Sequence, residues 1–171
     1  MASFTVSSAI NCKVMGYEFS GTGPFTVADE HLAEVKAMLE AGGETVTASK
    51  ITEQFLIPAV GTPANATDIL YVKPYQHVIT GAYLVPAAAV VGDATDYHTW
   101  TLCNYSAAGA VAGTFCSYAS TAGTLTALVR QSLGSVTGGT VSAGQGVVLA
   151  RSTAASGTAI PNMIAVIEYT L

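Results

Sequence analysis

Two carboxylates and an imidazole come together in the segment GDATDYH, which contains Asp93, Asp96 and His98. Such a group can hold a metal ion or act as a base–acid pair when neighbouring residues orient it. His98, however, is expected on a strand and on the same face as Trp100, and short acidic residues are also typical of tight turns. We therefore expect a structural turn here, with no catalytic or metal-binding residue.

The other residues with reactive side chains are isolated in the sequence. His31 is expected on the solvated face of a helix, and His77 at the start of a strand. The glycine-containing segments GTGP at Gly21 and SAGQG at Ser142 lack the strand–loop–helix context of a phosphate-binding loop. The sequence therefore predicts a protein that is not an enzyme and has no cofactor.

Three cysteines, Cys12, Cys103 and Cys116, form no CxxC motif. Cys103 and Cys116 fall on neighbouring predicted strands and could approach each other. Buried, reduced thiols in a protein that folds in the cytoplasm are the favoured interpretation, with a disulfide as the alternative.

The charge pattern limits the possible partners. Six basic and eleven acidic residues in 171 give a net charge of −5, and the basic residues are scattered along the chain. Nucleic-acid binding requires clustered lysine and arginine, so no nucleic-acid partner is expected. No window supplies the ~20 apolar residues of a membrane helix, and the N-terminus lacks the basic region of a signal peptide. The sequence thus predicts no membrane partner.

The centre of the predicted fold is a pair of strands at residues 78–85 and 97–105. The second strand alternates, with His98, Trp100, Leu102 and Asn104 on one face. Trp100, the only tryptophan, is placed mid-strand, where a large ring can anchor two packed sheets. This pattern predicts a β-sandwich.

Residues 1–57 are predicted to form a small α+β module. A helix is expected at about 30–41, with Asp29 as N-cap, Gly42 and Gly43 at its end, and one apolar face. That face contains Leu32, Val35, Met38 and Leu39. Strands are expected at 15–19, 25–27, 44–47 and 51–57. Residues 1–14 alternate weakly and have no obvious mate within the chain, so they are expected to form an edge or an arm that pairs with a neighbouring chain.

Residues 58–171 are predicted to form the β-sandwich, with a jelly-roll arrangement. Further strand patterns occur at 69–75, 111–118, 125–133, 136–141, 146–151 and 163–171, separated by glycine-containing turns. This region carries only seven charged side chains, against ten in residues 1–57. The low charge predicts either extensive contacts between subunits or a surface of threonine, serine and alanine.

The segments ITGAYLVPAAA, ATDYHTWTLCNYSAAGA and TVSAGQGVVLARSTAASGTAIPNMIAVIEY carry a family resemblance. They resemble the small jelly-roll accessory proteins of tailed bacteriophages, which are capsid decoration or head-fibre-like proteins. The shared features are an I-T-G strand ending in V-P, a turn into a TLxN strand, a V-x-A-G turn and a closing V-x-Y strand. The resemblance covers about two thirds of the chain and brings no active-site residues with it.

The resemblance implies a non-enzymatic virion protein on the capsid surface, made in the host cytoplasm. Its expected partners are the lattice of the major capsid protein and further copies of itself, as a homotrimer. A tail or baseplate component is one alternative. A carbohydrate-binding module for host attachment is another, and it would require an exposed platform of aromatic side chains. The aromatic residues in question fall inside strand patterns, which favours core or subunit contacts: Tyr71, Tyr75, Tyr83, Tyr97, Tyr105, Phe115 and Tyr118.

Overall fold

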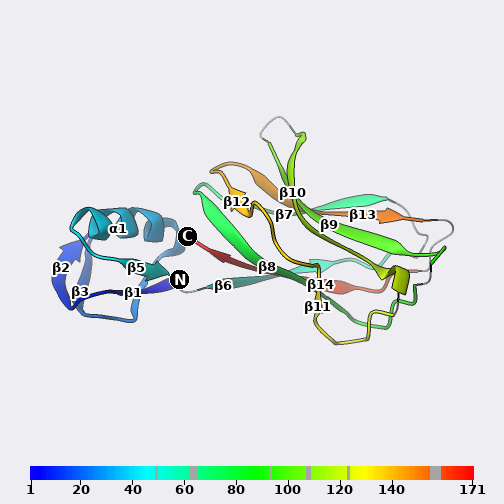
Figure 1. Cartoon of the computed structure of the whole chain (residues 1–171), viewed down its shortest axis with the longest axis horizontal. Helices are drawn as coiled ribbons and strands as arrows, with labels where there is room; N and C mark the ends of the chain where they lie inside the picture. Colours follow the sequence, from blue (N-terminus) through cyan, green and yellow to red (C-terminus); the bar gives the residue numbers. More distant parts are fainter. Residues whose placement is uncertain (49, 62–64, 93, 107–108, 123, 155–158) are drawn as a thin grey trace.

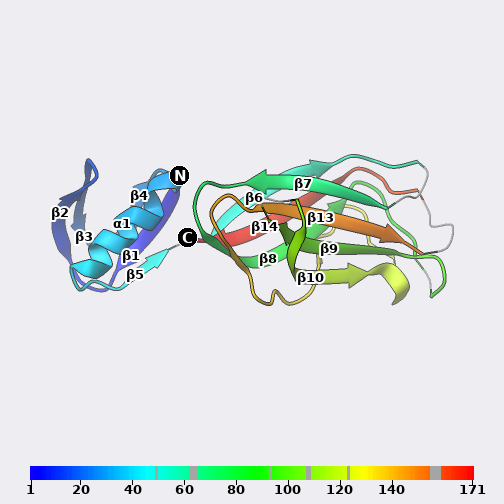
Figure 2. The same cartoon turned by 90° about the horizontal axis from the view of Figure 1, so that it is seen from above.

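The computed structural model describes residues 1–48, 50–61, 65–92, 94–106, 109–122, 124–154 and 159–171. A small N-terminal unit lies at one end of a longer, two-layered β-sandwich (Figures 1 and 2). Both chain termini lie where the two parts meet (Figure 1). None of the helices in the described part of the chain is both long and apolar enough to cross a membrane.

The N-terminal unit contains one helix and two small antiparallel sheets. Strand β1 (Ala2–Val6) lies between β4 (Phe25–Val27) and β5 (Val46–Ala48), and β2 (Ile10–Val14) pairs with β3 (Tyr17–Gly21). Strands β1 and β2 therefore pair within their own chain, so the expectation that they have no mate in it is wrong, although β2 does form a sheet edge. The reason is that Phe4 and Val6 are buried in a local core, which fixes β1 at the centre of its sheet.

Helix α1 (Asp29–Ala41) follows the predicted range closely. Its N-cap position is occupied by Ala28 and has no side-chain hydrogen bond, so the expectation that Asp29 caps the helix is wrong. Leu32, Val35 and Leu39 are buried against Phe4 and its neighbours, whereas Met38 is half exposed and lies outside this core. The apolar face of α1 thus closes a core that belongs to the N-terminal unit.

The sandwich consists of two antiparallel sheets. The first has the order β7–β13–β9–β10 and the second the order β6–β14–β8–β11, with β12 also pairing with β8. The strands of the first sheet are β7 (Ala66–Val72), β13 (Gly146–Thr153), β9 (His98–Tyr105) and β10 (Val111–Ala119). Those of the second are β6 (Ile51–Ile57), β14 (Met163–Thr170), β8 (His77–Pro86), β11 (Gln131–Ser132) and β12 (Thr140–Val141). A short 3-10 helix, Ser120–Ala122, follows β10.

This strand order is that of a jelly roll. When β11 and β12 are counted as one interrupted strand, the second sheet contains the first, eighth, third and sixth strands of the sandwich. The first sheet contains the second, seventh, fourth and fifth. A jelly roll, in which eight strands form two interlocked Greek keys, gives this alternation between the two sheets. The predicted mainly β fold, a jelly-roll-like sandwich with one N-terminal helix, is confirmed.

The inner faces of the two sheets enclose a continuous apolar core. Trp100, Leu102 and Leu149 contribute from the first sheet, and Ile167 and Tyr169 from the second. The predicted inward face of the 97–105 strand is confirmed, since His98, Trp100, Leu102 and Asn104 are all buried. The indole of Trp100 lies beside the rings of His98 and Tyr118, with centroids 5.6 and 6.4 Å away.

Several strand assignments differ from the sequence prediction, and of the strand expected at 136–141 only Thr140–Val141 (β12) forms. Strand β6 (Ile51–Ile57), expected in the N-terminal module, pairs along its whole length with β14 and is an edge strand of the sandwich. The transition between the two sheet systems therefore lies between Ala48 and Ile51, before the boundary expected after Ile57. Apart from the two residues of β11, the segment 125–133 is a loop and not the expected strand. Leu125 and Leu133 reach the core from this irregular backbone.

Candidate functional site

The acidic loop before β9 supplies no assembled site in the described residues. Asp93 lies outside them, and Asp96 is half-buried. His98 is fully buried, with its Nδ1 atom 3.1 Å from Thr153 Oγ1 and its backbone N–H donating to Ser120 Oγ. No cluster of three or more metal-ligating side chains occurs among the residues the structure describes. Hydrogen bonds and packing against the Trp100 ring thus fix His98 as part of the core.

A second group of titratable side chains gathers at the end of the sandwich that faces α1. The rings of Tyr71 from the end of β7, His77 from the start of β8 and Tyr169 from β14 pack against one another at tilted and edge-to-face angles, with centroids 5.2–6.3 Å apart. Lys73 Nζ donates to Glu53 Oε1 at 2.6 Å, and the Tyr169 hydroxyl donates to the same oxygen at 2.7 Å. We call these five residues the basal cluster.

The hydrogen bonds define the protonation states of the basal cluster. His77 Nδ1 lies 3.3 Å from the Tyr75 carbonyl oxygen, which only accepts, so this nitrogen carries the proton. Nε2 is then the acceptor for the Tyr71 hydroxyl at 3.0 Å. Burial raises the pKa values of Tyr71 and Tyr169 far above the usual range, with Glu53 adding to the effect, and burial lowers the pKa of His77. The cluster is thus a set of neutral rings around one ion pair.

The basal cluster stabilises the base of the sandwich and offers little access to a substrate. The Lys73 ammonium lies 4.8 Å from the ring centroids of both Tyr71 and Tyr169, so the cation is enclosed by aromatic faces. His77 is buried and borders a small cavity of about 230 Å³ that is shared with Lys36 and Glu40 of α1. The geometry supports a rigid junction beneath the N-terminal unit.

Lowering the pH from 7.5 to 5.5 is expected to reduce the stability of the fold through His77. In the unfolded chain a histidine binds a proton near pH 6.5, whereas burial in the folded state, reinforced by the Lys73 charge, lowers the pKa of His77. The unfolded state therefore binds more protons below about pH 6.5, and stability falls by about 1.4 kcal/mol per pH unit until the folded-state pKa is reached. Thermal denaturation against pH should show a weaker dependence for His77→Gln.

The control for this prediction is Tyr71→Phe. That substitution removes the hydrogen bond to Nε2 but keeps the buried histidine, so stability should drop at every pH with the wild-type pH dependence retained. An unchanged pH dependence in His77→Gln would contradict the assignment.

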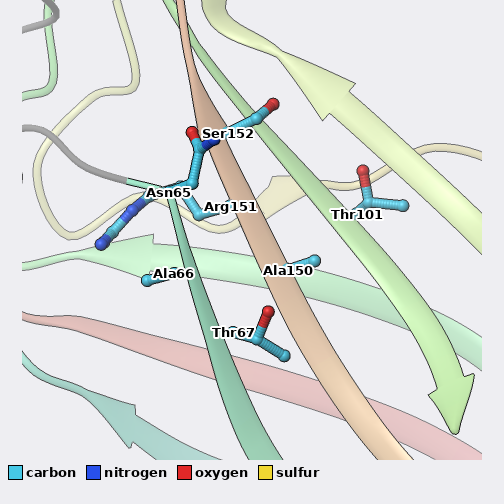
Figure 3. Close-up of a pocket in the computed structure, with 7 residues that line it drawn as sticks. All are labelled: Asn65, Ala66, Thr67, Thr101, Ala150, Arg151 and Ser152. Carbon is cyan, nitrogen blue, oxygen red and sulfur yellow. The ribbon is translucent and has the colours of Figure 1, made fainter. Parts of the chain in front are cut away.

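A cavity of about 380 Å³ lies on the outer face of the first sheet (Figure 3). Figure 3 shows the hydroxyls of Thr67, Thr101 and Ser152, which come from three different strands, spread along this face. In Figure 3 Ala150 lies between Thr67 and Thr101, and Arg151 is almost fully buried. The hydroxyls do not converge on one point, so the surface can bind a polar partner by hydrogen bonds but does not present a nucleophile with its base.

A larger and more apolar hollow continues along the same face. It has a volume of about 490 Å³ and is lined chiefly by Ile69, Val72, Tyr105 and Val148, with Gly144 and Gly146 beside them. We call these residues the β7 hollow. The side chain of Ile69 is 73% exposed and that of Val72 is 59% exposed. Exposed hydrophobic side chains gathered in this way make the hollow a candidate surface for contact with another molecule.

The second sheet also exposes apolar side chains, at the end far from α1. Leu56, Val85, Leu128 and Ile164 line one shallow depression, and we call them the Leu128 patch. Leu56 is 71% exposed and Leu128 is 77% exposed. Nearer the middle of the same face, Arg130 stacks on the Tyr83 ring and pairs with Glu168, which also pairs with Lys50. The Arg130 hydrogen bond lowers the pKa of Glu168.

Sequence reasoning named the tyrosines of the first sheet and His77 but missed Glu53, Lys73 and Tyr169. The seven aromatic residues considered for a sugar platform are buried or half-buried. The three cysteines are free thiols, with Cys103 and Cys116 buried, and burial raises the pKa of Cys116 to about 11.

Comparisons with known proteins yield few matches. No protein-family model matches the chain, and no curated protein matches it. One similar chain comes from the structure of infectious bursal disease virus Gx strain, with 8% sequence identity and a TM-score of 0.31. The similarity covers 99% of this chain and 51% of the viral one, so this chain spans about half the length of that protein. A likeness at this score carries no argument about function.

Proposed function

We propose that the chain is a non-enzymatic structural protein of a bacteriophage particle, which binds the assembled capsid and decorates or reinforces it. The observation that carries the proposal is the exposure of apolar side chains on the outer faces of both sheets. Leu56, Ile69 and Leu128 are each more than 70% exposed. A protein that works alone in solution rarely leaves two such surfaces uncovered. A component of a larger assembly covers them with its neighbours.

Two further features support this proposal. Jelly rolls are common building blocks of viral shells, although lectins and cupins use them too. The sequence segments around β8, β9, β13 and β14 resemble accessory head proteins of tailed phages. Neither feature fixes the position on the particle, and we favour the capsid surface because a homotrimer would suit its threefold and quasi-threefold sites.

The mechanism would be mass action. A protein that binds the assembled lattice and not the dissociated subunits stabilises the lattice by RT ln(1 + [L]/Kd), or about 2.7 kcal/mol per site at a hundredfold excess over Kd. The rigid sandwich would supply the contacts between copies, and the N-terminal unit would hold the major capsid protein.

The test is to locate the protein on intact particles and then to remove it. Electron microscopy of labelled particles should place it on the head, and purified protein should sediment with capsids that lack it. Such capsids should release their DNA at a lower temperature than decorated ones. Labelling of the tail or baseplate would assign the protein to the tail instead of the capsid. Protein that sediments with no phage structure would overturn the proposal.

The polar cavity of Figure 3 favours one other function, carbohydrate binding in host attachment. Its hydroxyls could bond to sugar hydroxyls, but no exposed aromatic ring accompanies them in the residues that line it. Retention on a glycan array that is lost in Thr101→Val would favour this second function over capsid binding.

A further inference from the structure

Strand β2 forms an open edge of the N-terminal unit. Among the described strands it pairs only with β3, and Figures 1 and 2 show it at the end of the molecule farthest from the sandwich. Residues 10–14 make no other backbone hydrogen bond to the described part of the chain. An uncovered edge of this kind exposes N–H and C=O groups that can pair with a strand of another chain.

The hairpin turn identifies the backbone groups on this edge. Met15 and Gly16, with φ angles of +50° and +86°, form a two-residue turn between β2 and β3. The residues that flank such a turn are hydrogen-bonded to each other, and hydrogen-bonded and non-hydrogen-bonded pairs alternate along the ladder. Asn11 and Lys13 therefore fall in non-hydrogen-bonded pairs with β3. Their backbone N–H and C=O groups point away from β3, to the open edge.

A cavity of about 320 Å³ lies beside this edge, between β2 and the C-terminal end of α1. On the β2 side it is lined by Ile10, Cys12 and Val14, whose partly buried side chains pack against the core of the unit. From α1, Met38 and Leu39 complete the apolar lining, and Met38 is 49% exposed. We call these five residues the β2 groove. A strand added to β2 would place every second side chain on the same face, and so in this groove.

The end of the groove where β2 begins is acidic. Glu44 lines it, and its carboxylate accepts hydrogen bonds from Ser7 and Ser8, which lie directly before β2. The Ser8 hydroxyl contributes most to lowering the pKa of Glu44, so this group is ionised at neutral pH. No basic side chain pairs with Glu44 in the described residues. The last turn of α1, where the carbonyls carry partial negative charge, holds no basic residue either. This end of the groove therefore favours a cation.

We propose that the β2 edge takes up an extended segment of the major capsid protein as an added antiparallel strand, with apolar side chains in the β2 groove and a lysine or arginine at Glu44. The inference rests on the proposed function and names the contact through which the N-terminal unit would hold the capsid. In antiparallel addition the C-terminal end of the segment lies at the start of β2, so its basic residue follows its apolar ones. Main-chain hydrogen bonds supply the affinity of such a contact, and the groove and the carboxylate supply its specificity.

The size of the contact explains why the assembled lattice would be preferred. Strand β2 has five residues, and a single added strand buries less than the ~800 Å² per partner of a standard interface. One copy alone therefore binds weakly. Linked copies that bind a repeating surface gain from effective concentration, which can raise the overall affinity ~10²–10⁴-fold. A homo-oligomer on the lattice has this gain, whereas a dissociated capsid subunit offers only one segment.

The test is cosedimentation of the full chain with capsids that lack it. Asn11→Pro removes an N–H from the open edge without removing a hydrogen bond to β3, and edge strands tolerate proline at such positions. The matched control, Ser20→Pro, makes the same change on the opposite edge of the hairpin and outside the groove. Asn11→Pro should weaken capsid binding at least ~tenfold, as expected for the loss of one hydrogen bond, whereas Ser20→Pro should not weaken it.

Two variants of the groove keep the proposal testable if thermal unfolding shows that Asn11→Pro is not folded. Glu44→Gln keeps an acceptor for the serine hydroxyls but removes the charge, so capsid binding should weaken about 2- to 5-fold and become less sensitive to salt. Met38→Ala shortens an exposed side chain, favours the helix and should also weaken binding. Cys12 gives an independent signal, because Cys103 and Cys116 are buried. Its reaction with a thiol reagent should slow when capsids are bound.

Three results would overturn the inference. The first is equal capsid binding by the Asn11→Pro and Ser20→Pro proteins, or by the two groove variants and the wild type if Asn11→Pro does not fold. The second is a Cys12 thiol that reacts equally fast in free and capsid-bound protein. The third is loss of self-association in place of capsid binding, which would make a second copy the occupant of the edge. In the first two cases the wild type still binds capsids and the proposed function stands, whereas wild-type protein that binds no capsid would overturn both.

Discussion

Replacing Trp100 by alanine is expected to cost about 3–5 kcal/mol of folding free energy, the usual range for deleting a large aromatic ring from a core. Trp100 is 1% exposed, lies in the central strand β9 and contacts the rings of His98 and Tyr118. A domain of this size is stable by only about 5–15 kcal/mol. The variant should therefore be insoluble or lose fixed side-chain packing.

The measurement is denaturant unfolding followed by near-UV circular dichroism. Trp100→Phe keeps a ring in the core and should lose less stability than the alanine variant. Val111→Ala changes an exposed residue on β10 of the same sheet and should stay within about 0.5 kcal/mol of the wild type. An alanine variant at Trp100 that unfolds at the wild-type denaturant concentration would contradict the central position of this residue.

The sequence was informative wherever one periodicity decided the outcome. The alternation around Trp100 predicted the buried face of β9, since a strand buries every second residue. The helix was predicted because its apolar residues recur at helical spacing and two glycines follow it. Met38 shows the limit of this reasoning, because it lies at the margin of the apolar stripe and remains half exposed.

Pairing between distant strands could not be predicted from local patterns. Strand β6 has the same alternation in either sheet system, and only its register with β14 assigns it to the sandwich. The segment from Leu125 to Leu133 has strand-like composition, but its two terminal leucines fill core positions from a loop. Burial of an apolar side chain does not require a strand.

The basal cluster had a signal that the sequence analysis did not use. Tyr71, Lys73, Tyr75 and His77 occupy alternate positions, which places polar and aromatic groups on one side of the chain. Glu53 and Tyr169 join them only through the pairing of β6 with β14. The Leu128 patch had no comparable signal, since its four residues come from four separate segments of the chain, which composition does not bring together.

A protein that begins at Lys50 is expected to keep its fold and its oligomeric state but to bind capsids at least ~100-fold more weakly, a loss of about 2.8 kcal/mol. It retains all the strands of the sandwich and the Lys50–Glu168 ion pair. The sandwich core contains no residue from the first 48. Removing the N-terminal unit uncovers Ile51 and Leu171, which contact both cores, so stability should fall by only about 1–3 kcal/mol.

The reason to assign attachment to the N-terminal unit is its charge. Residues 1–48 hold six of the eleven acidic side chains and two of the six basic ones, a net charge of −4 out of −5 for the whole chain. Charged groups fix orientation and register on a partner, and their contribution weakens as salt screens them. Capsid binding by the full chain should therefore weaken as salt is raised, whereas self-association through the uncharged patches should not.

Cosedimentation with capsids and sedimentation alone separate the possible outcomes for the shortened protein. Equal capsid binding by the shortened and full-length proteins would show that the sandwich makes the attachment, and the division of roles would be wrong. Aggregation of the shortened protein would show that α1 protects the base of the sandwich, where His77 and Leu171 border the cavity beneath the helix. Folded oligomers that no longer bind capsids are the expected result, because the first 48 residues have a core of their own and none of them belongs to the core of the sandwich.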